Sequence, residues 1–167
     1  MLPLKTLLLI RHAKSSWDMG IKNDFERTLN ERGKKDAPAM AERLLLKKIN
    51  IDAFVSSPAT RAKKTAEYFC NAYDVPHHNI LFIPKLYHAA SADFFDVIHQ
   101  LSNTINCVAI FSHNPGITEF VNQLIPTVEL DNMPTCGIFA VQIHTIDWAS
   151  FIAAKKDFLF FDYPKLS

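Results

Sequence analysis

Glycine is scarce in this chain, with only four residues among 167. A loop that binds nucleotide phosphates through its backbone amides needs glycines at fixed spacing. Neither G-x-x-x-x-G-K-[ST] nor G-x-G-x-x-G occurs, and the G-x-S-x-G turn of serine hydrolases is also absent. The sequence therefore excludes the common nucleotide and dinucleotide loops, and any phosphate site must use side chains.

Cysteine is also rare, and the three residues, Cys70, Cys107 and Cys136, lie far apart in the chain. No C-x-x-C pair occurs, so neither a disulfide framework nor a zinc site is indicated. We interpret Cys107 and Cys136 as small core residues because their neighbours are apolar. Four histidines lack the spacing of metal ligands and are expected at the surface or in turns: His77, His78, His99 and His144.

The chain has no excess of either charge and no long apolar run. Eighteen basic and seventeen acidic residues leave a formal charge of +1, which gives no reason to expect nucleic acid or an anionic membrane as a partner. No stretch approaches the length of a membrane span, and the N-terminal "LLLI" is too short for a signal peptide. We expect a cytoplasmic protein that forms one domain over residues 1–167.

Strand-like and helix-like segments alternate along most of the chain. Short apolar runs predict strands at 6–10, 53–55, 80–83 and 107–111, and a final antiparallel hairpin at 137–144 and 151–160. The intervening segments predict four helices. A capping box of Thr28 and Glu31 predicts the start of the first, and Pro38 is a candidate kink. The third helix is expected at 91–101.

Two further helix starts are predicted from a polar residue followed by proline. Ser57 before Pro58 and Asn114 before Pro115 each suggest an N-cap and a first helical residue. Strand–helix alternation predicts an α/β fold with a mainly parallel sheet, helices on both faces and an antiparallel C-terminal hairpin. In such folds the functional crevice lies beyond the carboxyl ends of the strands.

Three predicted strands lead into cationic or imidazole side chains. The first ends in Arg11 and His12, the second leads to a helix whose first turn carries Arg61, and the fourth is followed by His113. Each has a simpler explanation when taken alone, as a solvated arginine or a histidine bonded to backbone. If the strands are parallel neighbours, two arginines and two histidines converge with a helix N-terminus, which predicts a phosphate site.

Such a site has the groups needed for phosphoryl transfer. An unprotonated histidine can accept a phosphoryl group and form a covalent intermediate that water cleaves. Arg11 and Arg61 would disfavour imidazolium at His12 and neutralise the phosphoryl oxygens, to which His113 could donate a hydrogen bond. Adjacent residues of a regular strand point to opposite faces, so the chain is expected to bend after Arg11, where Ala13 permits close approach.

The segments "LLLIRHAKSSW", "RTLNERG", "SSPATRAKKTAE" and "SHNPGI" resemble, in this order, the histidine phosphatase (phosphoglycerate-mutase-like) superfamily. Within it the chain is similar to the small SixA-type phosphohistidine phosphatases, from Leu7 to about Tyr163. The resemblance implies a three-layer α/β/α domain without metal or organic cofactor. It also implies that His12 is the nucleophile and that Arg11, Arg61 and His113 complete the phosphate pocket.

Further residues are expected to contribute around this pocket. Lys14 and Arg27 follow the first motif closely and are placed at its rim as secondary phosphate-binding residues, with a solvated surface position as the alternative for both. Asn114, next to His113, is also expected to bind phosphate.

The sequence departs from the family pattern at two places. Alanine replaces the usual glycine after Arg-His, which is a mild change at Ala13. Esterase and mutase members carry an acidic residue after the third strand, where this chain has Tyr87 and His88, with Asp93 further on. His88 and Asp93 are therefore the candidate general acids. Without an acid, an alkoxide leaves poorly, whereas the imidazole of phosphohistidine accepts a proton readily.

These observations predict a metal-independent phosphatase that acts through phospho-His12, with phosphohistidine in a protein as substrate and inorganic phosphate as product. One alternative is a phosphomonoesterase for small phosphorylated substrates that uses His88 or Asp93 as acid. A second, from a different class, is a non-catalytic module that binds phosphate or a phosphoprotein.

Overall fold

Six strands form one sheet in this computed structural model, which describes residues 3–17, 20 and 23–166. The strands are β1 (Leu4–Arg11), β2 (Ala53–Ser56), β3 (Leu81–Phe82), β4 (Cys107–Ser112), β5 (Ile138–His144) and β6 (Lys156–Asp162). Their order is β3-β2-β4-β1-β5-β6. The first four are parallel, whereas β5 is antiparallel to β1 and β6 is antiparallel to β5. The predicted parallel sheet with its antiparallel C-terminal hairpin is confirmed.

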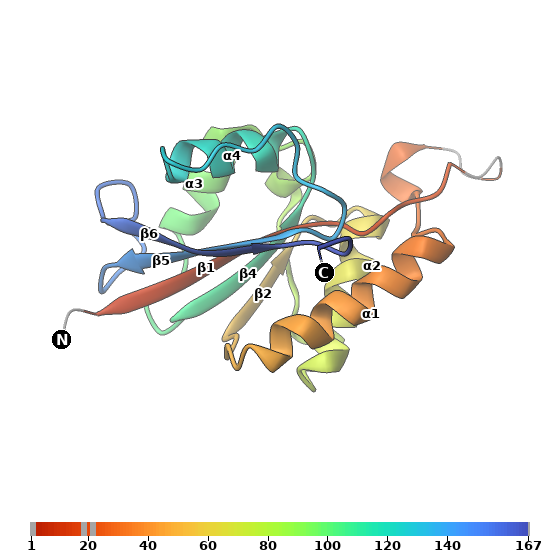
Figure 1. Ribbon diagram of the computed structural model, residues 1–167, viewed down its shortest axis with the longest axis horizontal. Coiled ribbons are helices and arrows are strands. Elements are labelled where there is room, and N and C mark those ends of the chain that lie inside the picture. The colour runs from red at the N-terminus through yellow and green to blue at the C-terminus, as the bar shows by residue number, and fades with distance from the viewer. Residues whose placement is uncertain (1–2, 18–19, 21–22, 167) are drawn as a thin grey trace.

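Helices cover both faces of the sheet (Figure 1). The four α-helices are α1 (Glu31–Leu46), α2 (Thr60–Ala72), α3 (Ser91–His99) and α4 (Gly116–Leu124), and three 3-10 helices are η1 (Asp24–Glu26), η2 (His77–Asn79) and η3 (Pro84–Leu86). Helices α1 and α2 lie on one face, and α3 and α4 lie on the other. The expected three-layer α/β/α architecture is therefore confirmed.

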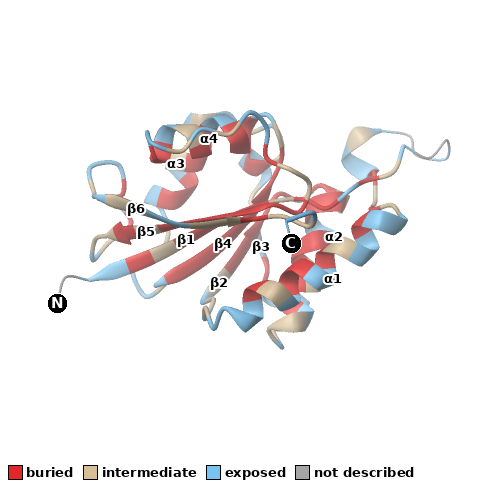
Figure 2. Ribbon diagram, in the orientation of Figure 1, coloured by how far each residue is buried: buried red, intermediate tan, exposed pale blue. Residues whose placement is uncertain are grey.

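The central strands β1 and β4 are buried along most of their length (Figure 2). Residues Leu7 to Ile10 are fully buried because helices cover both faces of the sheet. One apolar cluster packs α3 and α4 against the sheet, and a second packs α1 and α2 against the opposite face. The short apolar runs of the sequence are therefore strands buried on both sides.

The predicted starts of α1 and α2 are each wrong by two residues. The side chain of Asn30, not that of Thr28, caps α1 by accepting the backbone N–H of Gly33. Ser57 accepts the N–H of Ala59 instead of capping α2, which begins at Thr60. At α1 the side chain of Asn30, two residues further along the chain, caps the helix. At α2 the hydroxyl of Ser57 is used by the short turn that precedes the helix.

Asn114 is not a helix cap either. Its side-chain oxygen accepts the hydroxyl of Thr118, and its amide donates to Asn132 and to the backbone oxygen of Met133. Pro115 precedes the first helical residue, Gly116. Helix α1 continues through Pro38, whose ring is exposed.

Other predicted boundaries shift at the edges of the sheet. Strand β3 is limited to Leu81–Phe82, and α3 ends at His99 instead of residue 101. Strand β6 begins at Lys156 instead of residue 151. The ammonium group of Lys156 donates to the backbone oxygens of Phe151, Ile152 and Ala154, which holds residues 151–154 in a turn before the strand.

The crevice expected at the carboxyl ends of the strands lies between β1 and β4. These neighbouring parallel strands lead to helices on opposite faces, α1 after β1 and α4 after β4 (Figure 1). Diverging connections leave the ends of the two strands uncovered, which is where α/β proteins bind ligands.

The start of α1 packs tightly against the loop that follows β1. A Cβ atom on Gly33 would lie 2.1 Å from the backbone oxygen of Lys14, and the same oxygen accepts the N–H of Asn30. Only glycine permits this approach, because the obstructing atom belongs to the backbone. The loop beyond Ala13 is therefore held by the first turn of α1.

We expect Gly33→Ala to lower the free energy of unfolding by about 2 kcal/mol, because the added methyl group overpacks the contact with Lys14. Urea unfolding followed by circular dichroism measures the change. Gly20→Ala is the matched control, since no atom lies within 4 Å of a Cβ built there. Equal stability of the two variants would contradict the tight contact.

Candidate functional site

The loop after β1 is fixed by backbone hydrogen bonds to three other segments. The N–H of His12 donates to the oxygen of Ser112, and the oxygen of His12 accepts the N–H of Cys136. The N–H of Ala13 donates to the hydroxyl of Thr65, which itself donates to the backbone oxygen of Arg61. The chain leaves the strand after Arg11, as the sequence predicts, and His12 is held between β4, α2 and the segment before β5.

The imidazole of His12 has a defined proton position. Its Nδ1 lies 2.8 Å from the backbone oxygen of Ala13, and a carbonyl oxygen can only accept. The neutral ring therefore carries its hydrogen on Nδ1 and a lone pair on Nε2. The Nε–H of Arg61 donates to this Nε2 at 3.4 Å. The structure thus gives His12 an unprotonated Nε2 next to a guanidinium group.

Burial is the main reason why His12 stays neutral. It lowers the pKa of His12 well below 6.5, and the nearby His113, Arg61 and Arg11 lower it further, whereas the bond to Ala13 raises it. The guanidinium groups therefore act in the direction expected from the sequence. Their effect is smaller than that of burial, because the ring is only 6% exposed.

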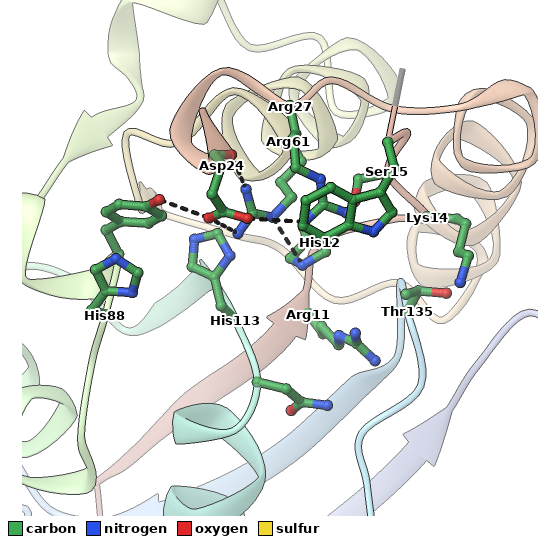
Figure 3. Close-up of a pocket in the computed structure, with 13 residues that line it drawn as sticks. Arg11, His12, Lys14, Ser15, Asp24, Arg27, Arg61, His88, His113 and Thr135 are labelled. Carbon is green, nitrogen blue, oxygen red and sulfur yellow. Dashed lines mark hydrogen bonds and ion pairs between the residues drawn. The ribbon is translucent and has the colours of Figure 1, made fainter. Parts of the chain in front are cut away.

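The four side chains from the strand ends meet around one cavity of about 510 Å³ (Figure 3). The rings of His12 and His113 lie 5.1 Å apart between centroids. His113 Nε2 shares a hydrogen bond of 2.7 Å with Ser57 Oγ, which comes from the end of β2. Arg11, His12, Arg61 and His113 are thus brought together as the strand topology implies.

Arg11 and His113 retain unused nitrogen atoms. Nη1 of Arg11 donates to the backbone oxygen of Met133 at 2.8 Å. Among the residues that the structure describes, Arg11 Nε and His113 Nδ1 are buried without a hydrogen-bond partner. Burial, followed by the charge of Arg61, lowers the pKa of both side chains, that of His113 to about 3. At neutral pH His113 is therefore a neutral ring among cations.

Four of the other predicted residues line the cavity: Lys14, Arg27, His88 and Asn114. Arg27 donates to the carboxylate of Asp24, to the hydroxyl of Ser15 and to the backbone oxygen of Ser16. The exposed ring of Trp17 stacks on its guanidinium, 3.4 Å from the centroid. Arg27 is therefore bound to protein groups on each nitrogen, so it is less available to a ligand than its place at the rim suggests.

Asp93 does not reach the cavity, which corrects its prediction as a general acid. Its carboxylate accepts the backbone N–H of Ala90 at 2.8 Å, at the start of α3. Asp93 stabilises the first turn of this helix, where a negative charge is favourable. His88 lines the cavity and stacks on Tyr87, with ring centroids 3.9 Å apart.

Asp24 belongs to the site although the sequence does not predict it. This residue lies in η1, and its carboxylate accepts hydrogen bonds from Arg27, Arg61 and Tyr87. It lies in the segment "NDFERTL" beside a second acidic residue, Glu26, and belongs to none of the strand-end motifs. Its only local signal is its position three residues before Arg27, so tertiary structure is needed to identify it.

No group of three metal-ligating side chains occurs within the described parts of the chain, residues 3–17, 20 and 23–166. Over the same residues, no helix has both the length and the apolar character needed to cross a bilayer. The cavity itself is lined chiefly by cationic and imidazole side chains, which suit an oxyanion.

Comparison with known sequences agrees with this chemistry. The family model of the histidine phosphatase superfamily (branch 1) matches residues 7–80, which include Arg11, His12 and Arg61. An uncharacterized chloroplastic protein of Arabidopsis thaliana is 28% identical over 152 residues, covering 86% of this chain and 69% of that protein. An uncharacterized protein of Mycobacterium tuberculosis is 29% identical over 106 residues, covering 64% of this chain and 63% of that protein.

Solved structures share the fold over nearly the whole chain. The protein histidine phosphatase SixA complexed with tungstate has a TM-score of 0.80 at 23% identity, covering 95% of this chain and 97% of that one. SixA from Agrobacterium tumefaciens has a TM-score of 0.77 at 24% identity, covering 96% and 98%. A mycobacterial glucosyl-3-phosphoglycerate phosphatase with VO3 has a TM-score of 0.73 at 15% identity, covering 95% and 99%.

The fold is therefore that of the histidine phosphatases, and the resemblance of the chain to this superfamily is confirmed. Within that class, SixA phosphohistidine phosphatases are among the structures that match it over nearly full length. The family match supports a phosphatase.

The buried histidines give the stability of the protein a defined pH dependence. The pKa of His12 and that of His113 are lowered from 6.5 in the folded chain, so the unfolded state binds more protons below pH 6.5. Stability is fully present above pH 6.5 and falls as the pH drops toward 3. We expect each histidine to contribute up to about 1.4 kcal/mol per pH unit.

Urea unfolding between pH 4.5 and 6.5 measures this slope. His113→Asn removes one of the two titrating rings. The change of its unfolding free energy with pH is therefore expected to be smaller than that of the parent by up to about 1.4 kcal/mol per pH unit, which corresponds to one proton. An unchanged slope in this variant would show that His113 is not held neutral by the fold.

Proposed function

We propose that this protein is a phosphatase that accepts a phosphoryl group on Nε2 of His12 and acts on phosphohistidine in a protein. The observation that carries the proposal is the unprotonated Nε2 of His12, buried and directed at the Nε–H of Arg61. Arg11 and His113 line the same cavity. A nucleophile and the groups that can stabilise phosphoryl oxygens are thus close together before any ligand binds.

The reaction would proceed in two transfers. The phosphoryl group is bound by the guanidinium groups of Arg11 and Arg61, and His12 Nε2 forms a bond to phosphorus as the N–P bond of the substrate breaks. The departing imidazole takes up a proton. Water then attacks phospho-His12, which releases inorganic phosphate and restores the neutral ring. The hydrogen bond from Nδ1 to Ala13 orients the ring through both transfers.

The acid–base character of the cavity favours a phosphoramidate over an alkyl ester. Asp24 is the one carboxylic side chain among the described residues that line it, and it accepts hydrogen bonds from three donors. These donors outweigh burial and hold the pKa of Asp24 well below its usual range. Asp24 is therefore an acceptor without a proton to give. An alkoxide would need that proton, whereas imidazole is easily protonated by solvent.

The shape of the rim supports a protein-borne phosphohistidine. Trp17 lines the cavity and is 77% exposed, and the exposed Lys14 also lines it. An exposed aromatic residue and a cation can contact the surface around a phosphorylated side chain. The full-length similarity to SixA structures is consistent with this substrate class.

A small-molecule phosphomonoesterase is the second candidate. His88 is in the cavity, and its ring could protonate a leaving oxygen. The fold is also shared with a mycobacterial glucosyl-3-phosphoglycerate phosphatase, whose name specifies a small phosphate ester.

A labelling experiment tests the nucleophile. After brief exposure to ³²P-phosphoramidate and rapid quenching, we expect a protein-bound label that is stable to alkali and labile to acid. The label should be absent from His12→Ala, because this variant lacks the accepting nitrogen. An undiminished label of the same lability in His12→Ala would exclude His12 as the nucleophile. Stoichiometric phosphate binding without any label or turnover would instead favour a binding module.

A substrate panel tests the leaving group. We expect kcat/KM for a phosphohistidine protein to exceed that for sugar, nucleotide and aryl phosphates by at least about tenfold, because the carboxylic side chain that lines the cavity, Asp24, has no proton to give to an alkoxide. His88→Ala should leave the phosphohistidine activity within about threefold of the parent. A preference for alkyl esters that is lost in His88→Ala would establish the phosphomonoesterase.

A further inference from the structure

Asp24 brings a negative charge into a cavity that otherwise suits anions. Among the described residues that line the cavity, it is the one acidic side chain (Figure 3). Its side chain is 38% exposed, and it comes from η1, outside the three strand ends that supply the other groups. A carboxylate here opposes phosphate binding by simple charge, so its presence requires a compensating role.

Asp24 binds one end of the Arg61 guanidinium. Nη1 of Arg61 donates to the backbone oxygen of Asp24 at 2.7 Å, and Nη2 donates to Oδ2 of the same residue at 2.9 Å. The Nε–H, on the side edge of the planar group, faces His12 Nε2 at 3.4 Å. A guanidinium group has five N–H donors in a rigid plane. Fixing two donors at its end therefore fixes the direction of the edge that faces His12.

The carboxylate that holds Arg61 is itself held from two other directions. The hydroxyl of Tyr87 donates to Oδ2 at 2.7 Å, and Nη1 of Arg27 donates to Oδ1 at 2.9 Å. Arg27 is bound in turn to the hydroxyl of Ser15, which follows the loop of His12 closely in the chain. Asp24 is thus the centre of a network that joins the loop after β1 to the start of α2.

Both partners of the Tyr87–Asp24 bond keep their protonation states. Burial raises the pKa of Asp24, but the hydrogen bonds from Tyr87, Arg27 and Arg61 together lower the pKa by more than burial raises it. The carboxylate is therefore ionised at neutral pH. Burial and the bond to Asp24 raise the pKa of Tyr87, so the phenol retains its proton. The network is therefore intact at neutral pH, where His12 is also neutral.

We propose that Asp24 is a positioning residue that orients Arg61, so that the Nε edge of its guanidinium faces the nitrogen that accepts the phosphoryl group. The inference rests on the proposed function, in which His12 Nε2 is that nitrogen. It gives η1 a part in orienting Arg61, although η1 lies outside the strand-end segments that carry Arg11, His12, Arg61 and His113. Asp24 does not touch the reacting atoms and acts through Arg61.

Two measurements on Asp24→Ala, Arg61→Ala and the double variant test the proposal. The first is kcat with a phosphohistidine protein, and the second is the affinity for inorganic tungstate by calorimetry. We expect Asp24→Ala to lower kcat by about 10²-fold, as misplaced catalytic groups do, and to weaken tungstate binding. Neither loss should recur when Arg61 is already absent, because the effect is transmitted through that residue.

Asp24→Asn separates the hydrogen bond from the charge and serves if Asp24→Ala does not fold. Its amide oxygen can still accept from Arg61, so kcat is expected to fall less than in Asp24→Ala. The matched control is Asp96→Asn, which removes an exposed carboxylate paired with Lys85 away from the cavity and should leave both measurements unchanged.

Three results would overturn the proposal. Tighter tungstate binding and higher activity in Asp24→Ala would show that the carboxylate competes with phosphate for Arg61. Equal losses with and without Arg61 would show that Asp24 acts independently, as an acid or base. An unchanged kcat with lowered thermal stability would show a role in folding alone. If the proposed function itself is wrong, the parent protein shows no turnover. The tungstate affinities of the single and double variants then still measure the coupling between Asp24 and Arg61.

Discussion

The parallel pairing of β1 with β4 is the constraint on which the site depends. In this register Arg11 lies opposite Ser112, and the next amide, that of His12, donates to the oxygen of Ser112. The two imidazoles follow directly from this last rung of the ladder, so their rings meet at 5.1 Å. A shift of one residue would turn every side chain of the strand to the opposite face and separate the rings. The apolar runs at residues 7–10 of β1 and 107–111 of β4 stabilise this pairing by burial on each face.

Electrostatics in the cavity is governed by burial more than by the number of charges. Two arginines lie close to both histidines, yet removal from water is the largest cause of their lowered pKa values. A buried ring cannot easily take up a proton, so the lone pair on His12 Nε2 persists even if the cations around it are screened by a bound anion. The carboxylate of Asp24 offsets part of the positive charge without altering this state, because it contacts the arginines and not the ring of His12.

The sequence was sufficient to predict the layers, the parallel sheet and the meeting of Arg11, His12, Arg61 and His113. These features follow from hydrophobic period and from the geometry of parallel strands. Helix starts were less predictable. Ser57 and Asn114 each have a side chain that can cap a helix but find other partners in the fold, and at α1 the cap is Asn30 instead of Thr28. The place of Asp24 depends on the contact of η1 with Arg61 of α2, and no periodic pattern encodes that contact. Asp93 was misassigned because nearness in sequence to the third strand does not reveal that its carboxylate is used by the turn at Ala90.

The hydroxyl of Thr65 links the loop of His12 to Arg61 through two hydrogen bonds. It accepts the amide of Ala13 and donates to the backbone oxygen of Arg61, so its only hydrogen is committed to one direction. Thr65 is therefore a fastening point shared by the loop of His12 and the helix that carries Arg61. Through this hydroxyl a displacement of α2 acts on the amide of Ala13 as well as on Arg61, which couples the position of His12 to that of the guanidinium group. The placement of His12 relative to Arg61 thus depends on a hydrogen-bonded side chain between them as well as on the rigidity of the strand and the helix.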